Sequence, residues 1–140
     1  MYLNMQKYFQ LEGLAYRIVP YKDAPKNGTT NTEIMYNNMM NKFKFGGIDT
    51  EKDIYLDENV LRMCRAHRQM FSELISKLIK EGKKEEAIAA LDYCLNVIPH
   101  SSVPHNFSST DFVEQYYAVG EKEKGRKKVN KIIVEQTIYL

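Results

Sequence analysis

The second half of the chain repeats one pattern of large and small apolar residues around two glycines, and this repeat limits the fold more than any other feature. Gly82 and Gly120 are 38 residues apart, and each lies between two stretches whose apolar residues recur at the spacing of a helix face. When the two glycines are aligned, large residues match large ones and small residues match small ones. The aligned pairs are Leu78 with Tyr116, Ala87 with Gly125, Leu91 with Val129, Cys94 with Ile132, and Leu95 with Ile133. The pattern predicts a mainly α fold in which two antiparallel helical hairpins follow one another.

The two hairpins are predicted to be TPR-like, that is, similar to tetratricopeptide repeats. In such a repeat a glycine turn joins two helices, a small residue early in the second helix lets the backbones approach, and a proline follows. Gly82, Ala87 and Pro99 occupy those three places. The glycine spacing exceeds the roughly 34 residues of a regular repeat, and two copies are fewer than the about three that usually stabilise an array. The alternative is that any two consecutive helical hairpins would align this well by chance.

Capping residues and helix breakers divide residues 57–140 into four helices. Asp57 is a suitable N-cap residue, Gly82 can adopt the left-handed conformation that ends a helix, and Pro99 cannot continue one. The polar connection over residues 100–109 is longer than most hairpin turns, which makes it the expected functional loop of this half. The expected helices cover residues 58–81, 84–98, 110–119 and 122–138.

Residues 1–56 are expected to form an N-terminal α/β cap segment, and residues 1–140 a single domain. Residues 54–56 are ambiguous, because they fit either a brief strand paired with residues 16–19 or a loop packed on the core. The other expected elements are a possible helical turn at residues 4–10, a strand at 14–19, a turn-rich loop at 21–30, and a helix that begins at Asn31 or Thr32 and ends before Gly46.

Composition excludes several classes of function. Lysine and arginine total 20 against 18 acidic residues, so the net charge of +2 gives no broad field to attract nucleic acid. No run of about 18 apolar residues is present, so no direct membrane insertion is expected, and the N-terminus lacks the order of a signal peptide. The apolar ends of the chain suit a piece of a longer protein. The basic run at residues 122–131 is interrupted by Glu123 and is expected to be a solvated helix face.

Side chains for catalysis or cofactor binding are sparse. The only histidines are His67, His100 and His105, and no serine or cysteine is placed with a histidine and an acid as a triad requires. His100 and His105 share a loop but lack a third ligand at metal-site spacing. Cys64 and Cys94 have no C-x-x-C spacing and are expected to be core residues, although their pairing stays open. The sequence therefore predicts no catalytic residues, no cofactor and no metal.

One row of arginines and a few aromatic residues form the candidate ligand or partner surface. Arg62, Arg65 and Arg68 follow at three-residue intervals and are expected on one helix face, where they could bind a phosphate, a carboxylate or a sugar acid in forked geometry, or form a solvated face. The polar connection and the helix after it add tyrosine and phenylalanine, which stack on sugars and anchor interfaces. These further candidates are Asn106, Phe107, Tyr116 and Tyr117.

Several segments also resemble a known family. Residues 8–20 read YFQLEGLAYRIVP, residues 36–40 YNNMM, residues 43–47 FKFGG and residues 55–58 YLDE. These resemble the C-terminal soluble region of a Bacteroidetes family of multipass membrane proteins related to protein O-mannosyltransferases. The resemblance implies a soluble tail with TPR-like hairpins on the extracytoplasmic, periplasmic side, tethered to the inner membrane by its parent protein. The catalytic acids of such transferases lie in the membrane region, so none is carried over to this chain.

Two hypotheses for function follow. The first is a non-catalytic protein-interaction or substrate-positioning domain of a membrane glycosyltransferase-like protein, with a polypeptide or the parent's membrane part as partner. The alternative is a small-ligand module that binds a glycan or sugar phosphate through the arginine row and the tyrosines. Nucleic acid is not expected as a partner, and enzyme activity of the chain itself is not expected because no site constellation is present.

Overall fold

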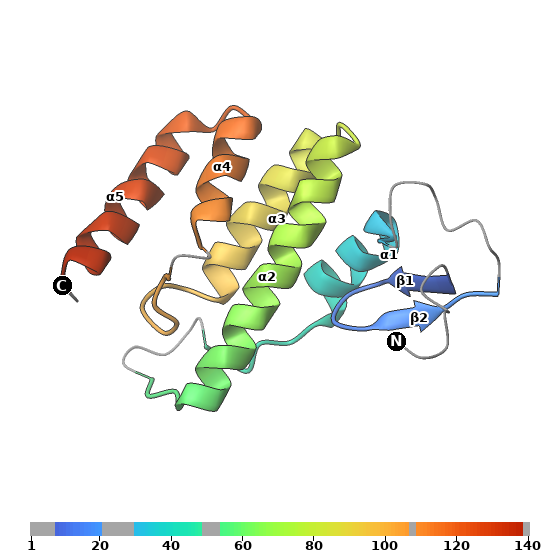
Figure 1. The fold of residues 1–140 in the computed structure, drawn as a ribbon, viewed down its shortest axis with the longest axis horizontal. Helices are drawn as coiled ribbons and strands as arrows, with labels where there is room; N and C mark the ends of the chain where they lie inside the picture. The colour runs from blue at the N-terminus through green and yellow to red at the C-terminus, as the bar shows by residue number, and fades with distance from the viewer. Residues whose placement is uncertain (1–7, 21–29, 49–53, 107–108, 139–140) are drawn as a thin grey trace. The chain divides into compact units, whose positions relative to one another are not determined.

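The structure, a computed structural model, is mainly helical with one small antiparallel sheet (Figure 1). It describes residues 8–20, 30–48, 54–106 and 109–138, and side chains as far as Lys131. The contacts divide the chain into two compact units, Met1–Phe43 and Lys44–Leu140. The predicted boundary after residue 56 therefore lies inside the second unit.

The first unit contains the two strands and a short helix. β1 (Phe9–Leu11) pairs antiparallel with β2 (Tyr16–Ile18), and Gln10 is opposite Arg17. α1 (Thr32–Asn37) begins where predicted, because the Asn31 side chain accepts a hydrogen bond from the Ile34 amide at 3.1 Å. It continues as the π-helix η2 (Asn38–Lys42). The buried apolar residues of this unit are Leu11, Val19, Met35 and Met39.

Three predictions for the N-terminal residues need correction. The helical turn at residues 4–10 is wrong at its C-terminal end, because Phe9 and Gln10 belong to β1, while residues 4–7 lie outside the described part. The strand predicted at residues 14–19 is shorter, Tyr16–Ile18, and it pairs with β1; residues 54–56 form no strand, so of their two alternatives the loop is correct. The helix from Thr32 ends at Lys42, and Phe43 is extended.

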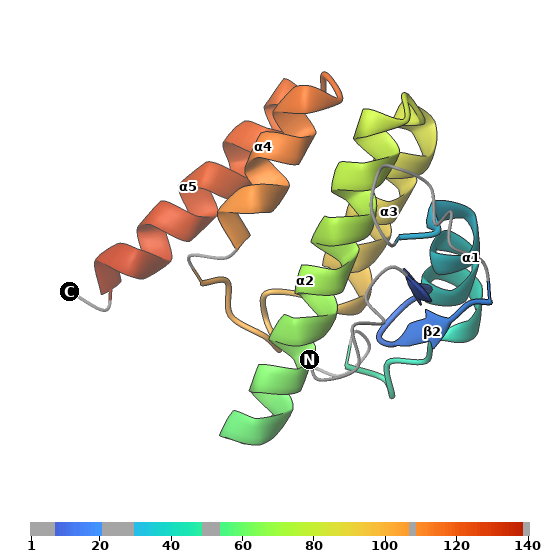
Figure 2. The same cartoon turned by 45° about the vertical axis from the view of Figure 1, so that its right-hand side comes forward.

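The second unit begins with a hairpin of two helices, α2 (Glu58–Lys80) and α3 (Lys84–Val97), which lie side by side in Figures 1 and 2. Asp57 caps α2 as predicted, since its carboxylate accepts the Val60 amide hydrogen bond at 2.8 Å. The facing stripes of the two helices fill the core, and most of their apolar residues are fully buried. These are Phe71, Leu74, Ile75, Leu78, Ala87, Ala90, Leu91 and Cys94.

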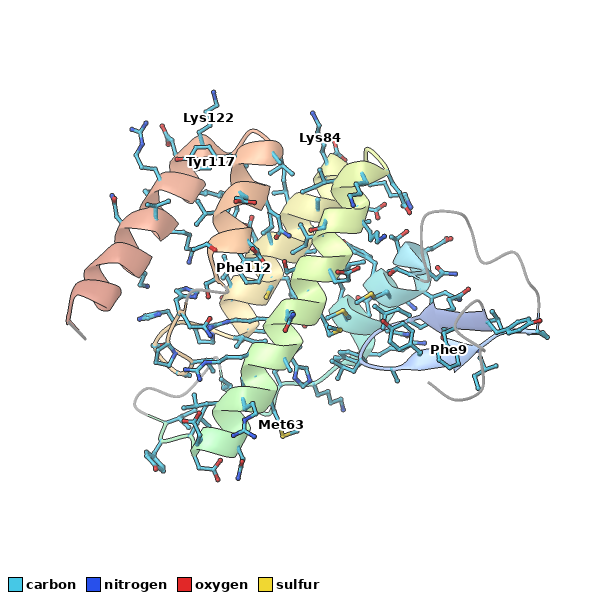
Figure 3. All side chains as sticks on the ribbon, in the orientation of Figure 1. Phe9, Met63, Lys84, Phe112, Tyr117 and Lys122 are labelled. Carbon is cyan, nitrogen blue, oxygen red and sulfur yellow. The ribbon has the colours of Figure 1, made fainter. Side chains whose placement is uncertain are left out.

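A second hairpin follows, formed by α4 (Thr110–Ala118) and α5 (Lys122–Ile138). Figure 3 shows Phe112 on α4 toward the first hairpin, and Tyr117 between α4 and α5. A Cβ built on Gly125 would lie 3.1 Å from the Tyr117 ring, so glycine allows the two helices to approach. The buried residues Phe112, Gln115 and Tyr116 form the inner side of α4.

The two hairpin turns have equivalent backbone hydrogen bonds, at positions 38 residues apart in the sequence. Gly82 donates to the Ile79 carbonyl and Gly120 to the Tyr117 carbonyl, both at 3.1 Å. The next amide bonds back across each turn at 2.9 Å, from Lys83 to Leu78 and from Glu121 to Tyr116. Both glycines have positive φ, 78° and 90°. The alignment predicted from sequence therefore matches equivalent backbone positions in the two turns.

Within the residues that the structure describes, every helix is too short or too polar to span a lipid bilayer.

Candidate functional site

A pocket of about 240 Å³ opens between α2 and the segment that leads into α4. α2 contributes a basic and polar wall, and the residues before and within the first turn of α4 contribute mostly polar side chains. The lining residues are Arg65, Arg68, Gln69, Ser72, Asn106, Ser109, Thr110, Asp111 and Phe112. We call it the arginine pocket. Three of the predicted surface residues, Arg65, Arg68 and Asn106, meet in it.

The prediction that the three arginines share one helix face is wrong. A helix turns about 100° per residue, so each three-residue step turns back by about 60°, and Arg62 and Arg68 are about 120° apart around the axis. Arg62 is exposed, Arg65 is partly buried, and Arg68 is only 3% exposed. Among the three, Arg62 therefore faces solvent and takes no part in the pocket.

Arg68 is held by backbone carbonyls. Its Nη2 donates to the carbonyls of Ile98 at 2.7 Å and Val103 at 2.6 Å, and its Nη1 reaches the Pro104 carbonyl at 3.5 Å. Ile98 is the C-cap residue of α3, so the guanidinium satisfies an acceptor at the negative end of that helix. Burial lowers the pKa of Arg68 to about 10, which still leaves it protonated at neutral pH.

The positive charge of Arg68 has no carboxylate partner in the described part of the chain. Arg65 approaches Glu58 only at 4.0 Å, where the glutamate is largely exposed, and such a pair is weak. Asp111 lines the pocket but forms no ion pair with either arginine. The Nε atoms of Arg65 and Arg68 are buried and have no hydrogen-bond partner among the described residues. The pocket wall is therefore positive.

The start of α4 is linked to the histidines of the preceding loop. Ser109 is the N-cap residue, but its side chain makes no cap bond and lies 3.1 Å from Nδ1 of His105. The His105 amide donates to Nδ1 of His100 at 2.9 Å, and the two rings stack at 4.8 Å. Burial, with Arg68 and His100 nearby, lowers the pKa of His105 to about 3, so its ring is neutral. These histidines fix the loop that carries Ser109.

Gln115 joins α4 to α2 beside the pocket. Its amide nitrogen donates at 3.0 Å to the carbonyl and the hydroxyl of Ser72 and to the hydroxyl of Ser76. The sequence analysis did not identify Ser72, Ser109 or Gln115 as site residues, although the sequence carries one signal for Ser72 and Gln115. Ser72 is four residues from Arg68 within the apolar stripe of α2, and Gln115 lies between Phe112 and Tyr116 on the inner side of α4. Polar residues on a core-facing stripe indicate a buried polar network.

The two aromatic candidates that the structure describes, Tyr116 and Tyr117, do not line the arginine pocket. Tyr116 is 2% exposed and donates to the Asp92 carboxylate at 2.9 Å, so it is a core residue with a polar tip. Tyr117 is 43% exposed and covers Gly125. Phe107 lies outside the described residues.

The chain matches no protein-family model, no curated protein and no solved structure. The resemblance to the O-mannosyltransferase-related family stays a prediction.

The chemistry that this arrangement supports is binding. Guanidinium, amide and hydroxyl groups converge on one opening, which suits an oxyanion. The imidazole of His105 is buried and contacts Ser109, at the end of the loop before α4. Cys64 and Cys94 are free and buried in the core.

Proposed function

We propose that the chain is a non-catalytic binding domain whose arginine pocket takes a small oxyanion, either a phosphate or a carboxylate. The observation that carries the proposal is Arg68, a charged and buried side chain on the wall of an open pocket, without an ion-pair partner in the described residues. A buried charge is costly unless it is paired. A bound oxyanion would supply the partner.

Arg65 adds a second guanidinium to the wall, and this partly exposed group can form charge-assisted hydrogen bonds with an oxyanion. Gln69, Asn106 and Ser109 offer neutral polar groups that can bind hydroxyls or further anion oxygens. Phosphorylated and acidic sugars combine these features in one ligand, and they agree with the small-ligand hypothesis. In the extracytoplasmic setting that the family resemblance implies, the domain would hold such a group near its parent protein.

Thermal melting with a panel of ligands tests the proposal. Inorganic phosphate, acetate and a hexose 1-phosphate are compared with the neutral hexose, because a ligand that binds the native state raises its melting temperature. The Arg65→Gln variant removes one charge from the pocket. The Arg62→Gln variant is its matched control, since it removes the same charge one turn earlier, on the exposed side of α2.

We expect phosphate or acetate to raise the melting temperature and the neutral hexose to have no effect. Arg65→Gln should weaken the anion affinity about tenfold or more, because a hydrogen bond to a charged group contributes about 1.5–3 kcal/mol. Arg62→Gln should stay within about twofold of the parent. Equal weakening by both variants, or no response to any anion, would contradict the proposal.

A further inference from the structure

A second positive feature of the helical unit has lining residues that are all different from those of the arginine pocket. A groove of about 430 Å³ is formed by α3, α4 and α5, with Tyr116 of α4 among its lining residues. α3 contributes Asp92, Leu95 and Asn96. From the part of α5 whose side chains are described, the lining residues are four lysines, Lys124, Lys127, Lys128 and Lys131. We call it the lysine groove.

The four lysines share one face of α5. Their spacing of three, four and seven residues from Lys124 is the spacing of side chains that lie along one stripe of a helix. The stripe extends over about 10 Å, at 1.5 Å per residue. Like charges at these separations repel one another. Four lysines along one stripe therefore lower the stability of the folded chain, unless negatively charged groups neutralise them.

Among the acids whose side chains the structure describes, ion pairs reach only one of the four lysines. Asp92 accepts a hydrogen bond from the Tyr116 hydroxyl at 2.9 Å and another from Lys124 at 3.0 Å. Glu121 lies 3.9 Å from the same lysine. Lys127, Lys128 and Lys131 have no acidic partner among residues whose side chains are described. Burial lowers the pKa of Lys128, and the charges of Lys131 and Arg68 add to the effect.

We infer that the lysine groove docks an acidic segment of a polypeptide, whose carboxylates pair with Lys127, Lys128 and Lys131. The lysines form a row and do not converge on one point, so a row of separate negative charges fits them better than a single phosphate. Leu95 gives the wall an apolar contact for side chains between the carboxylates. Tyr116, the only aromatic residue among the described lining residues, is 2% exposed and offers no face on which a nucleic-acid base could stack.

Fluorescence anisotropy with a defined probe tests the inference. The probe is a fluorescein-labelled peptide in which glutamate alternates with leucine, and its reference is the same peptide with glutamine in place of glutamate. The double variant Lys127→Gln/Lys131→Gln removes two charges from the groove. The matched control, Lys122→Gln/Arg126→Gln, removes two charges with the same spacing from exposed positions of α5 outside the groove lining.

The acidic peptide should bind and its glutamine counterpart should not. The groove variant should weaken binding about fivefold or more, and the control should change it by less than about twofold. Added salt should weaken binding to the unmodified protein more than binding to the groove variant. Thermal melts confirm that both variants fold.

Three results would overturn the inference. These are no binding of the acidic peptide, equal weakening by both double variants, or tighter binding of a single-stranded oligonucleotide of matched charge through the same lysines. The inference does not depend on the arginine pocket. Arg65→Gln should leave the peptide affinity unchanged, so failure at one site is distinguishable from failure at the other.

Discussion

His105 connects the charge of the pocket to the stability of the fold. The ring is buried beside Arg68 and stacked on His100, and Lys128 and Lys131 are close enough to add to the positive field. A protonated imidazole at this position would face like charges without the hydration it has in the unfolded chain. The folded protein therefore holds His105 neutral, with a pKa of about 3 against 6.5 for an unperturbed histidine.

This difference predicts a loss of stability in acid. Because the pKa of His105 is lower in the folded protein, the unfolded chain binds the proton first as the pH falls. The contribution of neutral His105 to the free energy of unfolding is therefore fully present above about pH 6.5 and is lost progressively toward pH 3. The contribution lost between pH 7 and pH 4 should be roughly 2–4 kcal/mol. Urea unfolding across this range measures it. His105→Asn should flatten the dependence, while His67→Gln on α2 should leave it unchanged; identical acid dependence in all three proteins would contradict the prediction.

Cys94 should be unreactive in the folded protein. It is fully buried on α3, and burial raises the pKa of its thiol to about 12, so almost no reactive thiolate exists near pH 8. A disulfide reagent should label Cys94 in urea but very slowly in buffer. Mass spectrometry of the labelled peptides identifies the site. Rapid labelling of Cys94 under native conditions would show that the hairpin opens more easily than its packing implies.

The arginines show how far sequence reasoning reaches at the scale of a residue. These residues were predicted to share one surface, and Arg65, Arg68 and Asn106 do meet in one pocket. Which arginine is buried was not predictable from the spacing alone, because it depends on where the loop after α3 returns to α2. The carbonyls that hold Arg68 come from residues 30 and 35 positions away.

At the scale of elements, local signals predicted the helices well. Their bounds follow from side chains and glycines next to the helix ends, such as Asp57 and Gly82, whose effects need no distant partner. β1 was missed because a strand of three residues is decided by its pairing with β2. The helix ends at Lys42, earlier than predicted, and this end also involves a contact with a distant residue. The Phe43 ring occupies the space beside Gly13 and would lie 2.9 Å from a Cβ built on that glycine.

The equivalent turns predict equivalent effects of mutation. Gly82 and Gly120 have positive φ, and nothing lies within 4 Å of a Cβ built on either, so any loss comes from the backbone and not from a clash. Gly82→Ala and Gly120→Ala should each lower the free energy of unfolding by about 1–2 kcal/mol. Gly82→Asn should cost less, because asparagine tolerates the left-handed region. Chemical denaturation measures all three, and a neutral Gly82→Ala would argue against the turn described.

At the scale of the whole molecule, a small net charge conceals two local concentrations of positive charge. The chain has a net charge of +2, yet one helical unit carries both the arginine pocket and the lysine groove. The net charge predicts no broad field, but it does not report how charges are grouped. The grouping arises from folding, which brings α2 to the start of α4 and places α5 opposite α3.

The arginine Nε–H resonances give the most direct test of the oxyanion pocket. The chain has five arginines, so each signal can be assigned in a nitrogen–proton correlation spectrum with single Arg→Lys variants. On titration with phosphate, we predict that the Arg65 and Arg68 signals shift together and saturate, while the signal of Arg62 does not move. Uniform, unsaturated shifts of all five signals, or no shift at Arg68, would contradict an oxyanion site at this pocket.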